Sequence, residues 1–158
     1  MTKSYANVSG ATDLESKLVA RALRCLEKRL RYCSETLTDS CSVRSYLQLH
    51  LATEKSEVFA VLFLDNSNRL LAFEKLFYGT INESMVYPRT VIQKALEHNA
   101  AKVILAHNHP SSNCNPSHAD EQITRDLKRI LSIIDVNVID HVIVSHQSSY
   151  SFAENGLL

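Results

Sequence analysis

Residues 57–64 read Glu-Val-Phe-Ala-Val-Leu-Phe-Leu, and this stretch is the strongest indication of how the chain folds. A continuous apolar run that follows one acidic residue is typical of a β-strand buried on both faces. Residues 65–68 are all turn formers, and residues 69–78 read as a return strand. The sequence therefore predicts a β-hairpin at this point of the chain.

Helical and strand patterns alternate on both sides of this hairpin. Apolar spacing predicts helices over residues 13–33, 43–53, 88–98 and 117–134, and short strands over residues 102–106, 138–144 and 150–153. Because helices and strands are interleaved, we expect a mixed α/β domain whose central sheet is covered by helices.

The first predicted helix has two contrasting faces. Its apolar row consists of Leu14, Leu18, Ala22, Leu26 and Leu30, with Val19 and Leu23 beside it. The opposite face carries Lys17, Arg21, Arg24, Lys28 and Arg31. A solvated face is the simpler interpretation of this basic stripe, and a docking surface for an acidic partner or nucleic acid is the alternative. In the helix over residues 88–98, Val91, Ile92, Ala95 and Leu96 are predicted to face inward.

Composition narrows the function classes. The 158 residues suit one domain, and the formal net charge of zero argues against a general nucleic-acid binder. None of the four cysteines forms a Cys-x-x-Cys pair, which argues against a cysteine zinc site and a thioredoxin-like site. No membrane-spanning run and no apolar signal segment are visible, so a cytoplasmic location is expected.

The chemistry is concentrated in two short motifs, His107-Asn108-His109-Pro110 and Ser117-His118-Ala119-Asp120. Residues two apart on a strand point to the same side, so both imidazoles can reach one point. The loop that follows can bring Asp120 back to them. Two imidazoles and one carboxylate suit Zn²⁺ and leave its fourth position for water, as in catalytic sites.

Each motif also has an ordinary structural interpretation. Ser117 and Asp120 form a capping-box variant at a helix start, and an isolated His-x-His is more often packing than ligand. Their combination in one short window favours metal binding, and the capping role is compatible with it. Cys114 is expected to be a bystander rather than a spare ligand, and His118 is expected to be exposed. Arg89 is either a substrate-carboxylate contact or a structural ion pair.

The spacing His107-x-His109-x7-Ser117-x2-Asp120 resembles the JAMM motif of the JAB1/MPN metalloprotease domain. The surrounding residues resemble the RadC family more closely, and the resemblance covers about residues 40–156. It implies a JAB1/MPN-like (cytidine-deaminase-like) three-layer α/β fold over residues 37–158, preceded by a helical lead-in over residues 1–36. Two departures are Ser112, where the family often has Gly, and Asn108, where eukaryotic JAMM enzymes carry Ser or Thr.

The resemblance implies a zinc-dependent metallopeptidase or isopeptidase with one Zn²⁺ per chain, held by His107, His109 and Asp120. Glu57 matches the upstream general base, Glu54 is a weaker candidate, and Ser117 matches the oxyanion donor.

The substrate implied is a peptide or protein, and the oligomeric state stays open. Asp140 and His141 either orient a ligand or serve the structure. The alternative function is a non-enzymatic, zinc-stabilised domain that binds a protein or DNA partner. Deamination ranks low, because no Cys-x-x-Cys ligand pair is present.

Overall fold

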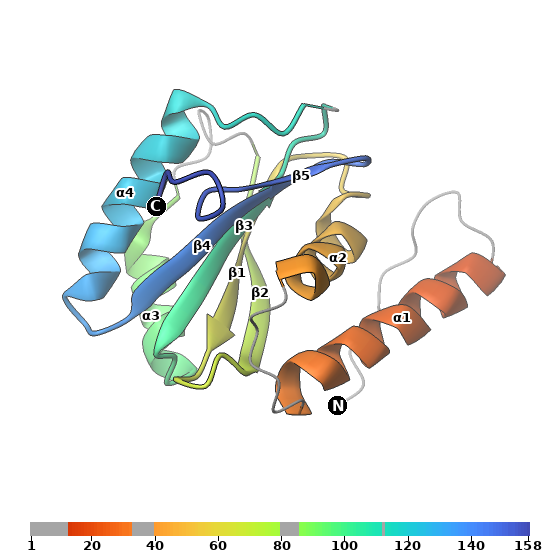
Figure 1. Cartoon of the computed structure of the whole chain (residues 1–158), viewed down its shortest axis with the longest axis horizontal. Coiled ribbons are helices and arrows are strands. Elements are labelled where there is room, and N and C mark those ends of the chain that lie inside the picture. Colours follow the sequence, from red (N-terminus) through yellow and green to blue (C-terminus); the bar gives the residue numbers. More distant parts are fainter. Residues whose placement is uncertain (1–12, 33–39, 80–85, 112) are drawn as a thin grey trace.

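The structure, a computed structural model of the chain, describes residues 13–32, 40–79, 86–111 and 113–158. These residues form a mixed α/β fold around one five-stranded sheet of order β2-β1-β3-β4-β5 (Figure 1). The strands are β1 Val58–Leu64, β2 Leu70–Tyr78, β3 Lys102–Asn108, β4 Asn137–Val144 and β5 Ser149–Ser151. The helices are α1 Asp13–Tyr32, α2 Ser40–Leu51, α3 Pro88–Glu97 and α4 His118–Ser132. Strands β3 and β4 pair in parallel and the other neighbours pair antiparallel.

Strand β1 is the centre of the core, and every one of its residues is buried. Alternate side chains pack on opposite faces, because successive residues of a strand point in opposite directions. Phe59, Val61 and Phe63 pack with residues of α3 and α4. The even-numbered residues of β1 pack with residues of α1 and α2. The three-layer architecture and the doubly buried strand expected from the sequence are thus confirmed.

The hairpin between β1 and β2 closes through a turn stabilised by one carboxylate. Asp65 Oδ1 accepts hydrogen bonds from the backbone N–H groups of Ser67 and Arg69, each over 2.9 Å. Asn68 has a positive φ of 59°, a conformation that asparagine tolerates better than most residues. The predicted hairpin is confirmed, with its turn at the predicted residues.

Helix α1 packs through a different stripe from the one predicted. Leu23 is buried, with Val19 and Leu26 packed against the same cluster. Leu14 and Leu18 are 68% and 58% exposed and Ala22 is exposed as well, so the assignment of these three residues to the inner face was wrong. The reason is geometric. In a helix of 3.6 residues per turn, each residue of a row spaced by four is rotated about 40° from the one before it. A row with this spacing therefore winds around the helix, and only part of it can face one packing surface.

Helix α3 begins at Pro88 and is followed by Asn99, whose φ of 50° is left-handed. Val91 and Ala95 are buried, as predicted, whereas Leu96 is 61% exposed and its assignment to the inner face was wrong. Ala95 already fills the interface at that turn, and the next residue lies about 100° further round the helix.

Some sequence predictions concern residues that the structure does not describe. They include the domain boundary at residues 36/37, the departure at Ser112, and the side chains of Leu30 and Arg31. In the described ranges, none of the helices is both long and apolar enough to traverse a lipid bilayer.

Candidate metal centre

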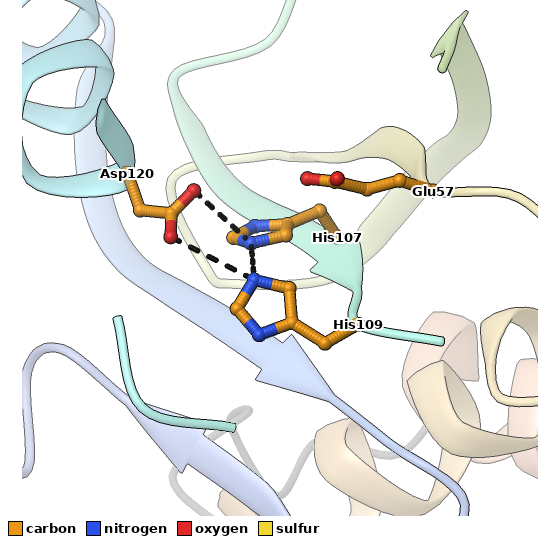
Figure 2. A group of neighbouring side chains, drawn as sticks. All are labelled: Glu57, His107, His109 and Asp120. Atoms are coloured by element: carbon orange, nitrogen blue, oxygen red, sulfur yellow. Dashed lines mark hydrogen bonds and ion pairs between the residues drawn. The ribbon is translucent and has the colours of Figure 1, made fainter. Parts of the chain in front are cut away.

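Four side chains meet at the end of the sheet where β1 begins and β3 finishes: Glu57, His107, His109 and Asp120. One potential ligand atom from each lies within 4.8 Å of the others. Figure 2 shows both carboxylates directed toward the paired imidazoles, Asp120 from the first turn of α4 and Glu57 from the residue before β1. The structure therefore brings together the three predicted metal ligands and the predicted base.

The end of β3 delivers the two histidines to one side. The strand runs to Asn108, two residues beyond the predicted end at Ala106, and the N–H of His109 donates to the Val144 carbonyl of β4 over 2.9 Å. This bond keeps the chain extended through His109. The Nε2 atoms of His107 and His109 are consequently 3.0 Å apart, as the two-residue spacing predicted.

Asp120 reaches the histidines while it caps its own helix. Its Oδ2 accepts hydrogen bonds from the backbone N–H of Ser117 over 2.7 Å and from the Ser117 hydroxyl over 2.6 Å. The Ser117 Oγ in turn accepts from the Asp120 N–H over 3.2 Å, which completes a capping box. The same carboxylate therefore caps the helix and faces the candidate metal position. The hydroxyl proton of Ser117 is used in the hydrogen bond to Asp120.

The donor atoms have the spacing that a small tetrahedral cation requires. Asp120 Oδ1 lies 3.2 Å from His107 Nε2, and Asp120 Oδ2 lies 3.7 Å from His109 Nε2. Ligand bonds of about 2.0–2.1 Å in a tetrahedron give ligand-to-ligand distances of about 3.4 Å. The separation of the two Nε2 atoms and the distances from them to the two oxygens of Asp120 lie close to that value, so the residues suit zinc.

Electrostatics put two of the ligands in their metal-binding forms. Burial alone would raise the pKa of Asp120, but the His109 and His107 rings beside it and the hydrogen bonds from Ser117 hold it well below its usual range. Complete burial, with His141 close by, holds the pKa of His107 well below its usual range. Asp120 is therefore ionised and His107 neutral near neutral pH. The Asp120 carboxylate beside it raises the pKa of His109.

His107 has a buried partner behind it. Its Nδ1 lies 2.8 Å from Nε2 of His141 on β4, and Nδ1 of His141 lies 2.6 Å from the hydroxyl of Thr124 on α4. Sequence reasoning missed Thr124. The available signal was one hydroxyl among the apolar residues that α4 turns inward. Asp140, in contrast, serves the structure, because its carboxylate accepts hydrogen bonds from Ser151 and from the Ala153 N–H.

Glu57 is positioned through the backbone around it. Its carbonyl accepts a hydrogen bond from the N–H of Gly79 over 2.8 Å, at the end of β2. Gly79 has a φ of 111°, which favours glycine. On the other side, the Asn108 side chain accepts from the Val58 N–H over 2.8 Å and donates to the Ser56 carbonyl over 3.1 Å. Sequence reasoning treated Asn108 only as a departure from other JAMM enzymes and missed this contact.

The remaining candidates lie outside the group. Glu54 forms an ion pair with Lys75 over 2.5 Å. Cys114 is buried and exchanges hydrogen bonds with Ser148, in keeping with a bystander. His118 is exposed, as predicted, and Arg89 is exposed as well.

The family model of the RadC-like JAB domain matches residues 37–157 of the chain. The chain belongs to the RadC-like JAB domain family. The resemblance read from its motifs is thus confirmed. The RadC-like chain is also similar to UPF0758 proteins, whose names state no activity.

Three of these relatives show the extent of the similarity. UPF0758 protein YkfG of Escherichia coli is 48% identical over 147 residues, which cover 93% of each chain. A UPF0758 protein of Methylibium petroleiphilum is 58% identical over 99% of this chain and 72% of its own length. One from Verminephrobacter eiseniae is 55% identical over 87% of this chain, but the match spans only 57% of that relative. The RadC-like chain therefore corresponds to nearly all of some relatives and to little more than half of others.

Proposed function

We propose that this chain is a zinc-dependent hydrolase, a metallopeptidase or isopeptidase that cleaves an amide bond in a peptide or protein. One observation carries the proposal. His107, His109 and Asp120 converge at separations of 3.0–3.7 Å, and the Glu57 carboxylate belongs to the same group. A site with only three protein ligands and an adjacent carboxylate is the arrangement of a catalytic rather than a structural zinc.

The three ligands have defined tasks in this proposal. His107 and His109 each offer Nε2, and the ionised Asp120 supplies the only negative charge among them. When bound, zinc lowers the pKa of a coordinated water toward about 7 and polarises the amide carbonyl. A single anionic ligand leaves the site with net positive charge, which favours this effect.

Glu57 is the general base of the proposal. Its carboxylate takes the proton from the attacking water and delivers it to the leaving nitrogen. Ser117 is the candidate oxyanion donor, a role worth roughly 3 kcal/mol in other hydrolases. Because its proton is bonded to Asp120 Oδ2, the Ser117 hydroxyl has to rotate away from that carboxylate to serve the substrate.

A non-enzymatic role as a zinc-stabilised domain that binds a protein or DNA is the second candidate. The observation that favours it is the exposure of Lys17, Arg21, Arg24 and Lys28 along α1. Charge reversal at Arg21 and Arg24 separates the two functions. If the chain is a binding domain, this charge reversal should abolish partner binding. If the chain is a hydrolase, it should leave zinc content and amide hydrolysis unchanged.

The metal is tested by elemental analysis of protein purified without chelator. About one zinc per chain is expected in the wild type and in Glu57→Gln, with loss in His107→Ala, His109→Ala and Asp120→Ala. Absence of zinc from the wild type, or equal zinc in every variant, rejects the metal assignment.

The activity is tested by incubating the zinc-loaded protein with a peptide library that includes lysine-linked isopeptides, in ¹⁸O-labelled water. Mass spectrometry should find cleaved products that carry the label in the new carboxyl group. Glu57→Gln is the matched control, since it keeps the ligands and removes the base. No labelled product from the wild type, or equal product from Glu57→Gln, contradicts the proposal.

A further inference from the structure

A buried chain of polar groups runs from His107 into the protein interior. It passes from Nδ1 of His107 to Nε2 of His141 over 2.8 Å, and from Nδ1 of His141 to Oγ1 of Thr124 over 2.6 Å. Thr124 then contacts the carbonyl oxygen of Asp120 over 2.5 Å. His107 and His141 are 0% exposed and Thr124 is 2% exposed, so bulk water does not compete for these bonds.

The last contact fixes the direction of the whole chain. A carbonyl oxygen can only accept, so the single hydroxyl proton of Thr124 lies toward Asp120. Thr124 Oγ1 is then left as an acceptor, and Nδ1 of His141 must carry a proton to donate to it. A neutral imidazole has one proton, so Nε2 of His141 accepts a hydrogen bond from Nδ1–H of His107. The Nε2 of His107 consequently keeps its lone pair.

The opposite direction is unfavourable in this geometry. If Thr124 donated to His141, its Oγ1 and the Asp120 oxygen would face each other over 2.5 Å with no proton between them. Both histidines would then carry their protons on Nε2. His107 would present an N–H to the ligand position, and an N–H cannot coordinate a metal.

We infer that His141 and Thr124 are positioning residues, which fix the proton of His107 on Nδ1 and leave Nε2 as the metal-binding atom. The inference rests on the proposed metal site for its purpose, but the proton positions are a property of the metal-free chain. We call this series of hydrogen bonds from His107 to Thr124 the relay. Its far end also contacts a second proposed ligand, because the Thr124 hydroxyl donates to the backbone carbonyl of Asp120. Two of the three ligands are thereby held by one hydroxyl.

Aromatic packing holds the middle ring of the relay in plane. His141 stacks on Phe152 with ring centroids 4.7 Å apart, and forms a T-shaped contact with Phe59 at a centroid distance of 5.8 Å. Phe59 is also stacked at 6.4 Å on His107. These contacts restrict rotation of both imidazoles, so hydrogen-bond direction is the remaining variable that selects the ligand atom.

The decisive experiment is long-range ¹H–¹⁵N correlation NMR of the metal-free wild type, which identifies the protonated nitrogen of each histidine ring. We expect Nδ1–H at both His107 and His141. A proton on Nε2 of either ring overturns the relay. This measurement needs neither zinc nor a substrate, so it succeeds or fails independently of the proposed activity.

A pair of variants then tests whether the relay matters for metal binding. Thr124→Val keeps the shape and removes the hydroxyl, and should weaken zinc binding by roughly tenfold in chelator competition while the Nδ1–H preference of His141 is lost. Thr124→Ser keeps the hydroxyl and should restore both readouts. Zinc affinity and proton positions that are unchanged in Thr124→Val would overturn the inference. If Thr124→Val does not fold, the wild-type spectrum still decides it.

Discussion

The side chain of Asn108 lies on the face of β3 opposite the two histidines, where it accepts a hydrogen bond from the backbone N–H of Val58 over 2.8 Å. Asn108 is the residue between the two candidate metal-binding histidines, and Val58 is the residue after the candidate base. The backbone pairing of β1 with β3 ends at Phe59 and His107. The Asn108 amide therefore continues that pairing by one step and connects the position of Glu57 to the position of the ligands.

Asn108→Ala should destabilise the fold without emptying the metal site. The substitution leaves the buried Val58 N–H without its side-chain partner and removes a bond to the carbonyl of the exposed Ser56. One buried unsatisfied group costs about 1–3 kcal/mol, so we expect a loss of that size in the free energy of unfolding, measured with urea. Zinc content should remain near that of the wild type, because the alanine keeps the strand that carries both histidines.

Asn155→Ala is the matched control for that variant. Asn155 also donates one side-chain hydrogen bond to a backbone carbonyl, that of Ser151 over 2.8 Å, but it is itself exposed. Its loss should cost less than about 1 kcal/mol. Equal effects of the two substitutions would show that the buried amide of Asn108 contributes no more to stability than an exposed one.

Ser117→Ala should affect the helix and the metal together. The hydroxyl caps α4 and also bonds Asp120 Oδ2. We expect a loss of about 1 kcal/mol of stability, the ordinary value for an N-cap. Weaker zinc binding in chelator competition should accompany it, because Asp120 loses one of the bonds that orient it. Ser117→Thr retains the hydroxyl and should preserve both properties; unchanged zinc affinity in Ser117→Ala would separate the cap from the metal site.

The sequence was sufficient for the parts of the fold that depend on local patterns. The apolar run of β1 predicted a doubly buried strand, and the polar residues after it predicted the hairpin turn. The orientation of α1 was not predictable in the same way. Its apolar residues spread too far around the helix to define one face, and the choice between Leu18 and Leu23 depends on where α2 and β2 lie.

The candidate site divides along similar lines. His107, His109 and Asp120 are close in sequence, and strand and helix geometry is enough to bring them together. Thr124 and Asn108 act through contacts across separate elements, so no spacing rule identifies them. Their types carried a partial signal, because a hydroxyl on an inward face and an amide in a buried strand both need partners.

The packing of α1 gives a direct comparison of two leucines on one helix. Leu23 is 4% exposed and Leu18 is 58% exposed. Leu23→Ala should lower the free energy of unfolding by about 2–4 kcal/mol, since it opens a cavity between α1 and α2. Leu18→Ala should change it by less than about 0.5 kcal/mol. Urea denaturation of the two variants measures the difference, and similar losses would place α1 on the core through a different face.

Acid should destabilise the metal-free protein through its buried histidines. Burial lowers the pKa of His141 to about 4, from the ordinary 6.5 that applies to the unfolded chain. Between those two values the unfolded state binds more protons than the folded state, so stability rises with pH and is lost on acidification. Burial, together with the charge of Lys75, likewise lowers the pKa of His50 to about 4, so it acts in the same window.

The expected loss is about 3 kcal/mol from His141 when urea unfolding of the metal-free protein is followed from about pH 7 to about pH 4. His141→Gln should reduce the dependence of stability on pH, whatever it does to stability at neutral pH, because the titrating group is gone. His118→Gln, which replaces an exposed histidine, is the matched control. If the free energy of unfolding of the wild type does not change across this pH range, His141 takes up a proton in the folded state. Its ring would then be less buried than its contacts with His107, Thr124 and Phe152 indicate.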